Sequence, residues 1–119
     1  MKRILVVDDE IGIAEAVSDL LGDEGYVVDV ARNGEDAITL LSAKRFDLVL
    51  LDWMMPITDG LGVMTALRGM ANRKSPPVIV MSALPEDVVR SDAEIAGFLR
   101  KPFDVGDLLR VVSQTLPAR

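Results

Sequence analysis

The sequence predicts an α/β domain in which helices cover both faces of a doubly wound parallel sheet. Short runs of Val, Leu and Ile alternate five times with segments whose apolar residues recur at helical spacing. The connections between these segments are short, which favours parallel strands joined by helical crossovers. The run at 48–52 is apolar up to its final Asp, as expected for a central strand that is buried on both faces.

The first half of the chain is predicted to contain three strands and two helices. The strands are the apolar runs 3–7, 26–31 and 48–52. The first helix has apolar residues on one face, at Ile13, Val17, Leu20 and Leu21. Gly22 and Gly25 mark its end. Asn33 is the predicted N-cap of the second helix, whose inner face carries Ala37, Leu40 and Leu41.

The second half is predicted to add three helices and two strands. A turn at 56–60 leads into a helix that ends before residues 72–75 and has Leu61, Met64 and Leu67 on one face. The strands are 78–81 and 98–100, and Pro85 begins a helix between them that extends to about Ile95. Asp104 is predicted to cap the last helix, with the apolar stripe Leu108, Val111, Val112 and Leu116.

Composition limits the classes of function. With 119 residues, the chain is expected to form one domain, residues 1–119. No apolar run approaches the roughly 18 residues that span a bilayer, and the N-terminus does not resemble a signal peptide, so we expect a cytoplasmic protein without a membrane partner. The net charge of -6 argues against nucleic acid as a direct partner. Because Cys and His are absent, chemistry must come from carboxylates, hydroxyls and lysines.

Polar side chains gather at the predicted carboxyl ends of four strands. Asp8 and Asp9 follow the first strand, and Asp52 ends the third. Ser82 follows the fourth strand and Lys101 the fifth. These ends lie on one edge of a parallel sheet, where α/β proteins bind ligands. Three carboxylates repel one another unless a cation lies among them, and Mg²⁺ with its oxygen ligands fits such a site. The hydroxyl and the ammonium are then suited to contact phosphate oxygens.

Each of these residues also has a simpler interpretation. Acidic residues after a strand often cap a helix, a Ser at a strand end is commonly a turn residue, and a Lys is commonly solvated. The pair Lys101-Pro102 can be a strand terminator alone. These simpler interpretations would have to hold at four strand ends at once, so we favour a cation and phosphate site with Asp52 as its central residue.

Four motifs resemble those of the receiver domains of two-component response regulators. They are Val6-Val7-Asp8-Asp9-Glu10, Leu51-Asp52-Trp53-Met54-Met55-Pro56-Ile57-Thr58-Asp59-Gly60, Met81-Ser82-Ala83 and Lys101-Pro102-Phe103. The resemblance covers the whole chain. It implies a stand-alone, single-domain receiver with a flavodoxin-like repeat of five βα units and strand order 2-1-3-4-5.

The resemblance also implies the chemistry. A sensor histidine kinase or a histidine phosphotransfer protein would pass a phosphoryl group from its phosphohistidine to Asp52. Such a domain is a signalling module that catalyses only its own phosphotransfer and a slow autodephosphorylation. The modified domain would then change its surface for a downstream protein, as a monomer or a weak, phosphorylation-linked dimer.

Individual roles follow from the same resemblance. Mg²⁺ would be the cofactor, bound directly by Asp9, Asp52 and the backbone carbonyl of Met54, with Asp8 binding mainly through water. The residues that would contact the phosphoryl oxygens are Ser82 and Lys101. Phe98 matches the aromatic residue that changes rotamer on activation, which makes Ser82 and Phe98 the expected switch. The bond between Lys101 and Pro102 would be cis, a form common only before proline.

The chain departs from the family pattern in two places. The segment from Ser82 to Lys101 is shorter than usual, so the helix within it is expected to be compact or irregular. In the family that helix, the fifth strand and the last helix form the usual output and dimerisation face. The second departure is that Met54 and Leu84 are apolar where polar residues often occur, which bears on the lifetime of the phosphoryl group.

Three other classes of protein fit the sequence less well. A haloacid-dehalogenase-like phosphatase needs a second Asp two residues after the nucleophile, where Met54 stands. A flavodoxin-like FMN carrier needs a phosphate loop rich in Ser, Thr and Gly after the first strand, and Asp8-Asp9-Glu10 would repel the phosphate. The remaining alternative is a receiver-shaped interaction module that works without phosphorylation. The complete set of acidic, hydroxyl and ammonium residues argues against it.

Overall fold

The computed structural model describes residues 2–55, 60–69, 76–92 and 95–116. Strands and helices alternate in the order β1 (Arg3–Val7), α1 (Ile11–Asp23), β2 (Val27–Ala31), α2 (Gly34–Ala43), β3 (Leu48–Asp52), α3 (Gly60–Arg68), β4 (Val78–Ser82), α4 (Glu86–Asp92), β5 (Gly97–Arg100) and α5 (Val105–Thr115). The predicted turn at 56–59 and the predicted helix end near 72–75 lie outside the described residues.

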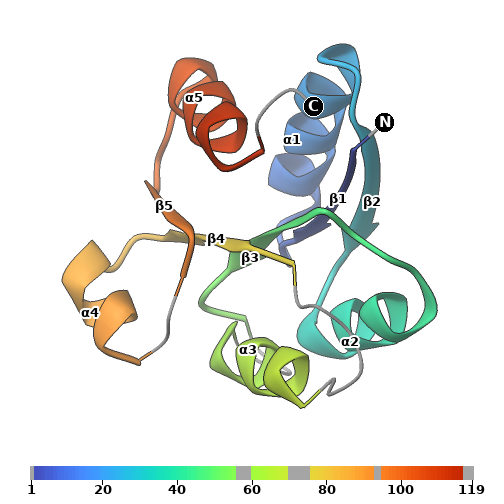
Figure 1. The fold of residues 1–119 in the computed structure, drawn as a ribbon. Coiled ribbons are helices and arrows are strands. Elements are labelled where there is room, and N and C mark those ends of the chain that lie inside the picture. The colour runs from blue at the N-terminus through green and yellow to red at the C-terminus, as the bar shows by residue number, and fades with distance from the viewer. Residues whose placement is uncertain (1, 56–59, 70–75, 93–94, 117–119) are drawn as a thin grey trace.

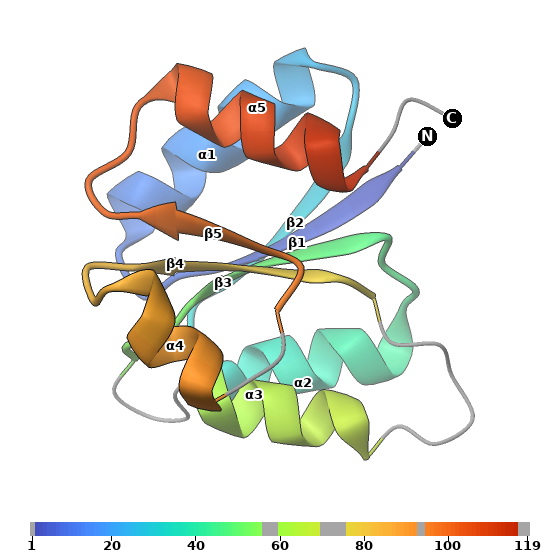
Figure 2. The ribbon, with the colours of Figure 1, turned by 60° about the vertical axis from the view of Figure 1, so that its left-hand side comes forward.

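The five strands form one parallel sheet in the order β2-β1-β3-β4-β5. The predicted fold class and strand order are therefore confirmed. The sheet twists through the middle of the molecule, with α1 and α5 on one face and α2, α3 and α4 on the other (Figures 1 and 2).

Two hydrophobic clusters, one on each face, hold the helices against the sheet. Ile4 and Val6 of β1 contribute to the cluster under α1 and α5, whereas Leu5 and Val7 contribute to the cluster under the other helices. Successive side chains of a strand point to opposite faces, so one run of apolar residues supplies both clusters. All five residues of β3 are buried, as the sequence predicts for a central strand.

The helix starts follow the predicted caps. The side chain of Asn33 accepts a hydrogen bond from the backbone N–H of Asp36 at 2.8 Å, and Asp104 accepts one from Asp107 at 2.8 Å. Each cap satisfies an N–H group that has no partner within the helix. Gly25 follows the end of α1 at Asp23 and has φ +97°, a conformation that favours glycine.

The fourth helix is shorter than predicted. It ends at Asp92, so the prediction that it extends to Ile95 is wrong. The chain must be extended by Ala96, whose N–H donates to the carbonyl of Val78 at 2.8 Å. Because the chain pairs with β4 from Ala96 onward, α4 has room for only about two turns after Pro85. The short helix agrees with the expected compact segment.

Candidate acidic site at the carboxyl edge of the sheet

The three predicted carboxylates meet at the carboxyl edge of the sheet. Asp8 follows β1, Asp52 is the last residue of β3, and these strands are neighbours. One carboxylate oxygen from each of Asp8, Asp9 and Asp52 lies within 4.8 Å of the others. Asp8 and Asp52 are buried, with relative exposures of 0% and 4%, whereas Asp9 is exposed. The site therefore has a buried base and an open side.

Backbone N–H groups hold the two buried carboxylates in place. Oδ1 of Asp8 accepts a hydrogen bond from the N–H of Glu10 at 2.9 Å. Oδ1 of Asp52 accepts one from the N–H of Met54 at 3.3 Å. Each donor lies two residues after its acceptor, the pattern by which an Asp side chain stabilises its own turn. The turns after β1 and β3 thus orient the carboxylates that the strands bring together.

Lys101, the residue directly after β5, lies among the carboxylates. Its Nζ lies 3.0 Å from Oδ2 of Asp8, 3.6 Å from Oδ1 of Asp52 and 3.8 Å from Oε1 of Glu10. Burial alone would lower the pKa of Lys101, but its hydrogen bond with Asp8 and the neighbouring negative charges outweigh burial and raise that pKa. The ammonium therefore stays charged. The peptide bond between Lys101 and Pro102 is cis.

The electrostatics of Asp52 differ from those of an ordinary aspartate. Burial and the charge of Asp8 raise the pKa of Asp52 from 3.8 to about 7. Lys101 and the N–H of Met54 act in the opposite direction but do not cancel the effect. Without a cation, the central carboxyl group therefore binds a proton near neutral pH, because full ionisation would place two negative charges side by side in a buried site.

The predicted switch residues lie on the two strands next to this site. Ser82 ends β4 and is buried, and its Oγ accepts a hydrogen bond from the N–H of Leu84 at 3.0 Å. Phe98 of β5 pairs in register with Val80 of β4, two residues before Ser82. Its half-buried ring packs against the same cluster as Leu84. The two residues therefore belong to adjacent strands and share a packing environment.

Met54 and Leu84 lie in different environments in the structure. Met54 is 64% exposed on the open side of the site, whereas Leu84 is half-buried against the cluster under α4. Glu10 was given no role from the sequence, although the structure brings its carboxylate to Lys101. The sequence signal for Glu10 is its place as the third acidic residue in Asp8-Asp9-Glu10.

Comparisons with known proteins agree on one family. The model described as "Response regulator receiver domain" matches residues 4–113. The transcriptional regulatory protein ResD of Bacillus subtilis is 39% identical over 123 residues, which are 95% of this chain and 50% of ResD. DltR of Streptococcus agalactiae is 39% identical over 110 residues, 90% of this chain and 48% of DltR. The chain thus spans about half the length of these curated relatives.

Solved structures give the same result. The chemotaxis protein CheY4 of Vibrio cholerae superposes with a TM-score of 0.91 at 30% identity, covering 98% of this chain and 99% of CheY4. The response regulator TrrA of Thermotoga maritima, crystallised in complex with Mg²⁺ and BeF, superposes with a TM-score of 0.83 at 37% identity, covering 98% of this chain and 100% of TrrA.

Proposed function

This chain belongs to the response regulator receiver domain family, and on that premise we propose that Asp52 accepts a phosphoryl group from a phosphohistidine. Receiver domains serve phosphorelay signalling rather than metabolic catalysis. The observation that carries the proposal is the meeting of three carboxylates and one ammonium around a buried Asp at the carboxyl edge of the sheet.

The donor set fits a hard divalent cation. Asp8, Asp9 and Asp52 offer carboxylate oxygens within 4.8 Å of one another, and oxygen ligands are those that Mg²⁺ prefers. We assign the cation to these three residues and to the backbone carbonyl of Met54. When bound, Mg²⁺ would neutralise charge on the carboxylates and on the transferred phosphoryl group.

The residues of the chain supply the remaining chemistry. An ionised oxygen of Asp52 attacks phosphorus, an O–P bond forms, the N–P bond of the phosphohistidine breaks, and the imidazole leaves and takes up a proton. Lys101 lies 3.6 Å from Asp52 and remains charged, so it can stabilise the negative charge of the phosphoryl oxygens. Ser82 supplies a hydroxyl donor from the neighbouring strand.

Two classes of partner follow from this function. The phosphoryl donor is a sensor histidine kinase or a histidine phosphotransfer protein, and a downstream protein responds to the signal.

We place the reaction in the cytoplasm. Among the described residues, none of the helices combines the length and the apolar character that crossing a membrane requires.

Labelling with acetyl phosphate tests the acceptor. The wild-type protein should gain one phosphoryl group only when Mg²⁺ is present, as measured by intact mass. Asp52→Asn should abolish labelling and Asp9→Ala should remove most of it, because the first lacks the nucleophile and the second lacks a cation ligand. Lys101→Ala should still be labelled, more weakly, since Lys101 stabilises charge without forming the bond. The matched control is Asp19→Asn, which changes an exposed carboxylate of α1.

Two outcomes would contradict the assignment. Undiminished labelling of Asp52→Asn would show that another residue is the acceptor. A wild-type protein that folds, binds Mg²⁺ and is never labelled would favour an interaction module that works without phosphorylation.

A further inference from the structure

Glu10 adds an exposed carboxylate to the acidic site. It occupies the N-cap position of α1, but its side chain makes no capping hydrogen bond. At this position Ser, Thr, Asp or Asn usually accepts a bond from the first helical turn. The carboxylate of Glu10 instead lies 3.8 Å from Nζ of Lys101, and its side chain is 63% exposed. Capping of α1 therefore does not explain where this carboxylate lies.

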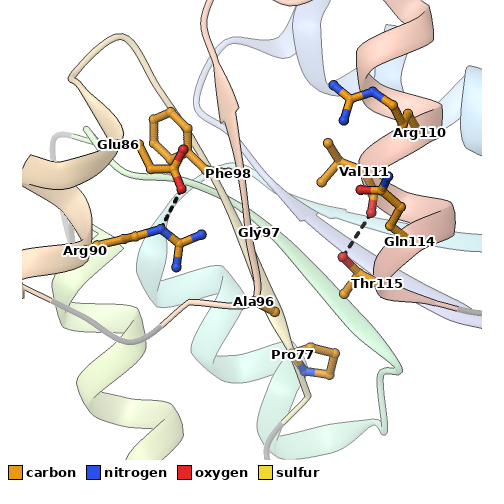
Figure 3. A pocket seen from close by; sticks show the side chains of 10 residues that line it. All are labelled: Pro77, Glu86, Arg90, Ala96, Gly97, Phe98, Arg110, Val111, Gln114 and Thr115. Atoms are coloured by element: carbon orange, nitrogen blue, oxygen red, sulfur yellow. Dashed lines mark hydrogen bonds and ion pairs between the residues drawn. The ribbon is translucent and has the colours of Figure 1, made fainter.

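The contact of Glu10 with Lys101 differs from an ion pair within one helix. Glu86 and Arg90 are one turn apart in α4, beside a groove along β5, and such a pair supports the helix that carries it (Figure 3). Glu10 and Lys101 follow β1 and β5, two strands that are not neighbours in the sheet. Their contact therefore does not stabilise a single helix or a pair of strands. It changes the charge beside the nucleophile.

The distances indicate that Glu10 acts through its charge. A separation of 3.8 Å is within ion-pair range but too long for a hydrogen bond, so Glu10 does not fix the ammonium of Lys101 as Asp8 does at 3.0 Å. In water without salt, two unit charges roughly 6 Å apart change a binding or rate constant about threefold. The charge of Glu10 is therefore large enough to affect a charged ligand that approaches Asp52.

Among the described charged residues around Lys101, Glu10 is the one that remains unbalanced. The three carboxylates of the cation site carry three negative charges when ionised, and Lys101 neutralises one of them. On the proposed function, one divalent cation would remove the other two. The carboxylate of Glu10 then leaves the site with a net negative charge. A donor with two negative charges is repelled more strongly by this carboxylate than a donor with one.

We propose that Glu10 is a specificity-determining residue whose charge disfavours doubly negative phosphoryl donors relative to singly negative ones. This inference rests on the proposed function, because it concerns the donor from which Asp52 takes the phosphoryl group. The disfavoured class is the acyl phosphates, which are doubly negative near neutral pH. The favoured class is the phosphoramidates, whose protonated nitrogen lowers the net negative charge. Phosphohistidine has the same N–P bond as this second class.

Two simpler roles of Glu10 would give different results. A carboxylate at a helix N-terminus stabilises the helix, so loss of that role would weaken the fold and lower cation binding and labelling together. A contact that only holds Lys101 would change labelling by every donor to the same extent. Repulsion changes the two classes of donor unequally, and it acts with the opposite sign on a cation. The signs of the effects therefore separate the three roles.

Two small donors test the proposal on the full chain at saturating Mg²⁺. Acetyl phosphate is doubly negative and phosphoramidate is singly negative. In both reactions the carboxylate of Asp52 forms a bond to phosphorus while the bond to the leaving group breaks, and acetate or ammonia leaves. Initial labelling rates are followed by intact mass for the parent, Glu10→Gln and Glu10→Asp. The matched control is Glu24→Gln, which removes an exposed carboxylate at the opposite end of α1.

At an ionic strength of about 0.03 M, Glu10→Gln should speed labelling by acetyl phosphate about fivefold and by phosphoramidate about twofold. The ratio of the two rates should therefore rise about twofold. Glu10→Asp keeps the charge and should restore the ratio of the parent, and Glu24→Gln should leave it unchanged. In about 1 M salt the change in ratio should disappear, because the screening length is then about 3 Å.

Binding of Mg²⁺ is a second measurement, made without any donor. The fluorescence of Trp53, which is buried directly after Asp52, follows the titration. Glu10→Gln should weaken Mg²⁺ binding by up to about fivefold, because the variant removes a negative charge near the cation. The same substitution should thus speed labelling and weaken cation binding. Damage to the fold would lower both.

Four results would overturn the proposal. An unchanged rate ratio in Glu10→Gln, with Asp52 still labelled, would do so and would leave Asp52 as the acceptor. An equal change of the ratio in Glu24→Gln would show that the net charge of the protein sets it. Slower labelling by both donors, together with weaker Mg²⁺ binding, would assign Glu10 a structural role. A parent protein that neither donor labels would overturn the proposed function and this inference with it.

Discussion

Replacing Asp52 by Asn should change how the stability of the protein depends on pH. The folded state raises the pKa of Asp52 from 3.8 to about 7, so between these values the folded protein binds a proton that the unfolded chain does not. Stability from this group is therefore greatest at low pH and is lost as pH rises through 7. Asn carries no charge at any pH, so the variant lacks this dependence. In the absence of divalent cations, Asp52→Asn should be more stable than the parent at pH 8.

The size of the effect follows from the shift. Each pH unit between the two pKa values changes the free energy of unfolding by about 1.4 kcal/mol. When the pH falls from 8 to 5, it passes the folded pKa of about 7 and continues for about two further units. Over those two units, Asp52 of the folded protein holds a proton that the unfolded chain lacks. The advantage of Asp52→Asn over the parent should therefore shrink by roughly 3 kcal/mol between pH 8 and pH 5. Taking the difference between two proteins at each pH removes most of the contribution of other titrating groups.

Urea unfolding in EDTA at pH 5 and pH 8 measures this difference. The fluorescence of Trp53, which is buried, and far-UV circular dichroism report unfolding independently. The control Asp19→Asn removes the same charge from an exposed site and should change the free energy of unfolding by less than about 0.5 kcal/mol at either pH. An advantage of Asp52→Asn that is the same at both pH values would refute the idea that burial and Asp8 suppress ionisation of Asp52.

Three further predictions concern the lifetime, the packing and the switch. Hydrolysis of the acyl phosphate needs a positioned water, and the apolar Met54 and Leu84 offer no group to hold it. The double variant Met54→Asn with Leu84→Glu should therefore lose its phosphoryl group at least several-fold faster, as followed by intact mass. A stabilisation of the transition state by about 1.4 kcal/mol is already a tenfold change in rate. An unchanged or slower decay would show that these side chains do not control water access. A Cβ at Gly97 would lie 3.2 Å from side-chain atoms of both β4 and α5, so Gly97→Ala should destabilise by about 1–3 kcal/mol in urea. Gly22→Ala, which meets nothing within 4 Å in α1, should stabilise slightly, and a Gly97→Ala protein as stable as the parent would show that the packing yields. Ser82→Ala should accept phosphate without the NMR shifts on β5 that the phosphorylated parent shows. Equal shifts in both proteins would place the coupling elsewhere.

The site was predictable because it depends on where strands end. Asp52 follows four buried apolar residues, and parallel strands place all their carboxyl ends on one edge. Knowing the strand boundaries to within one or two residues is enough to bring Asp8, Asp52 and Lys101 together. The four consecutive buried residues of β1, Ile4–Val7, likewise require helices on both faces. These conclusions depend on the spacing at which apolar residues recur, and that spacing can be counted in the sequence.

Other features depend on contacts that are distant in sequence. After α4, the N–H of Ala96 donates to the carbonyl of Val78, and neither residue signals this contact locally. The sequence predicts that Lys101 contacts a phosphoryl oxygen. It does not predict the hydrogen bond between Lys101 and Asp8, which lie 93 residues apart. Neither contact is a pattern within one segment.

The charge balance of the acidic site accounts for its unusual carboxyl group. Asp8, Asp9 and Asp52 carry three negative charges when ionised, and Lys101 neutralises one of them. Two negative charges remain, which is the deficit that one divalent cation removes. Without the cation, a proton on Asp52 removes part of it, and burial together with the charge of Asp8 accounts for a pKa of about 7 despite the adjacent ammonium. A proton and a cation would therefore compete for the oxygen of Asp52 that, on the proposed mechanism, attacks phosphorus. On the proposed mechanism, the burial that raises the pKa of Asp52 leaves less of the ionised nucleophile at neutral pH without the cation than with it.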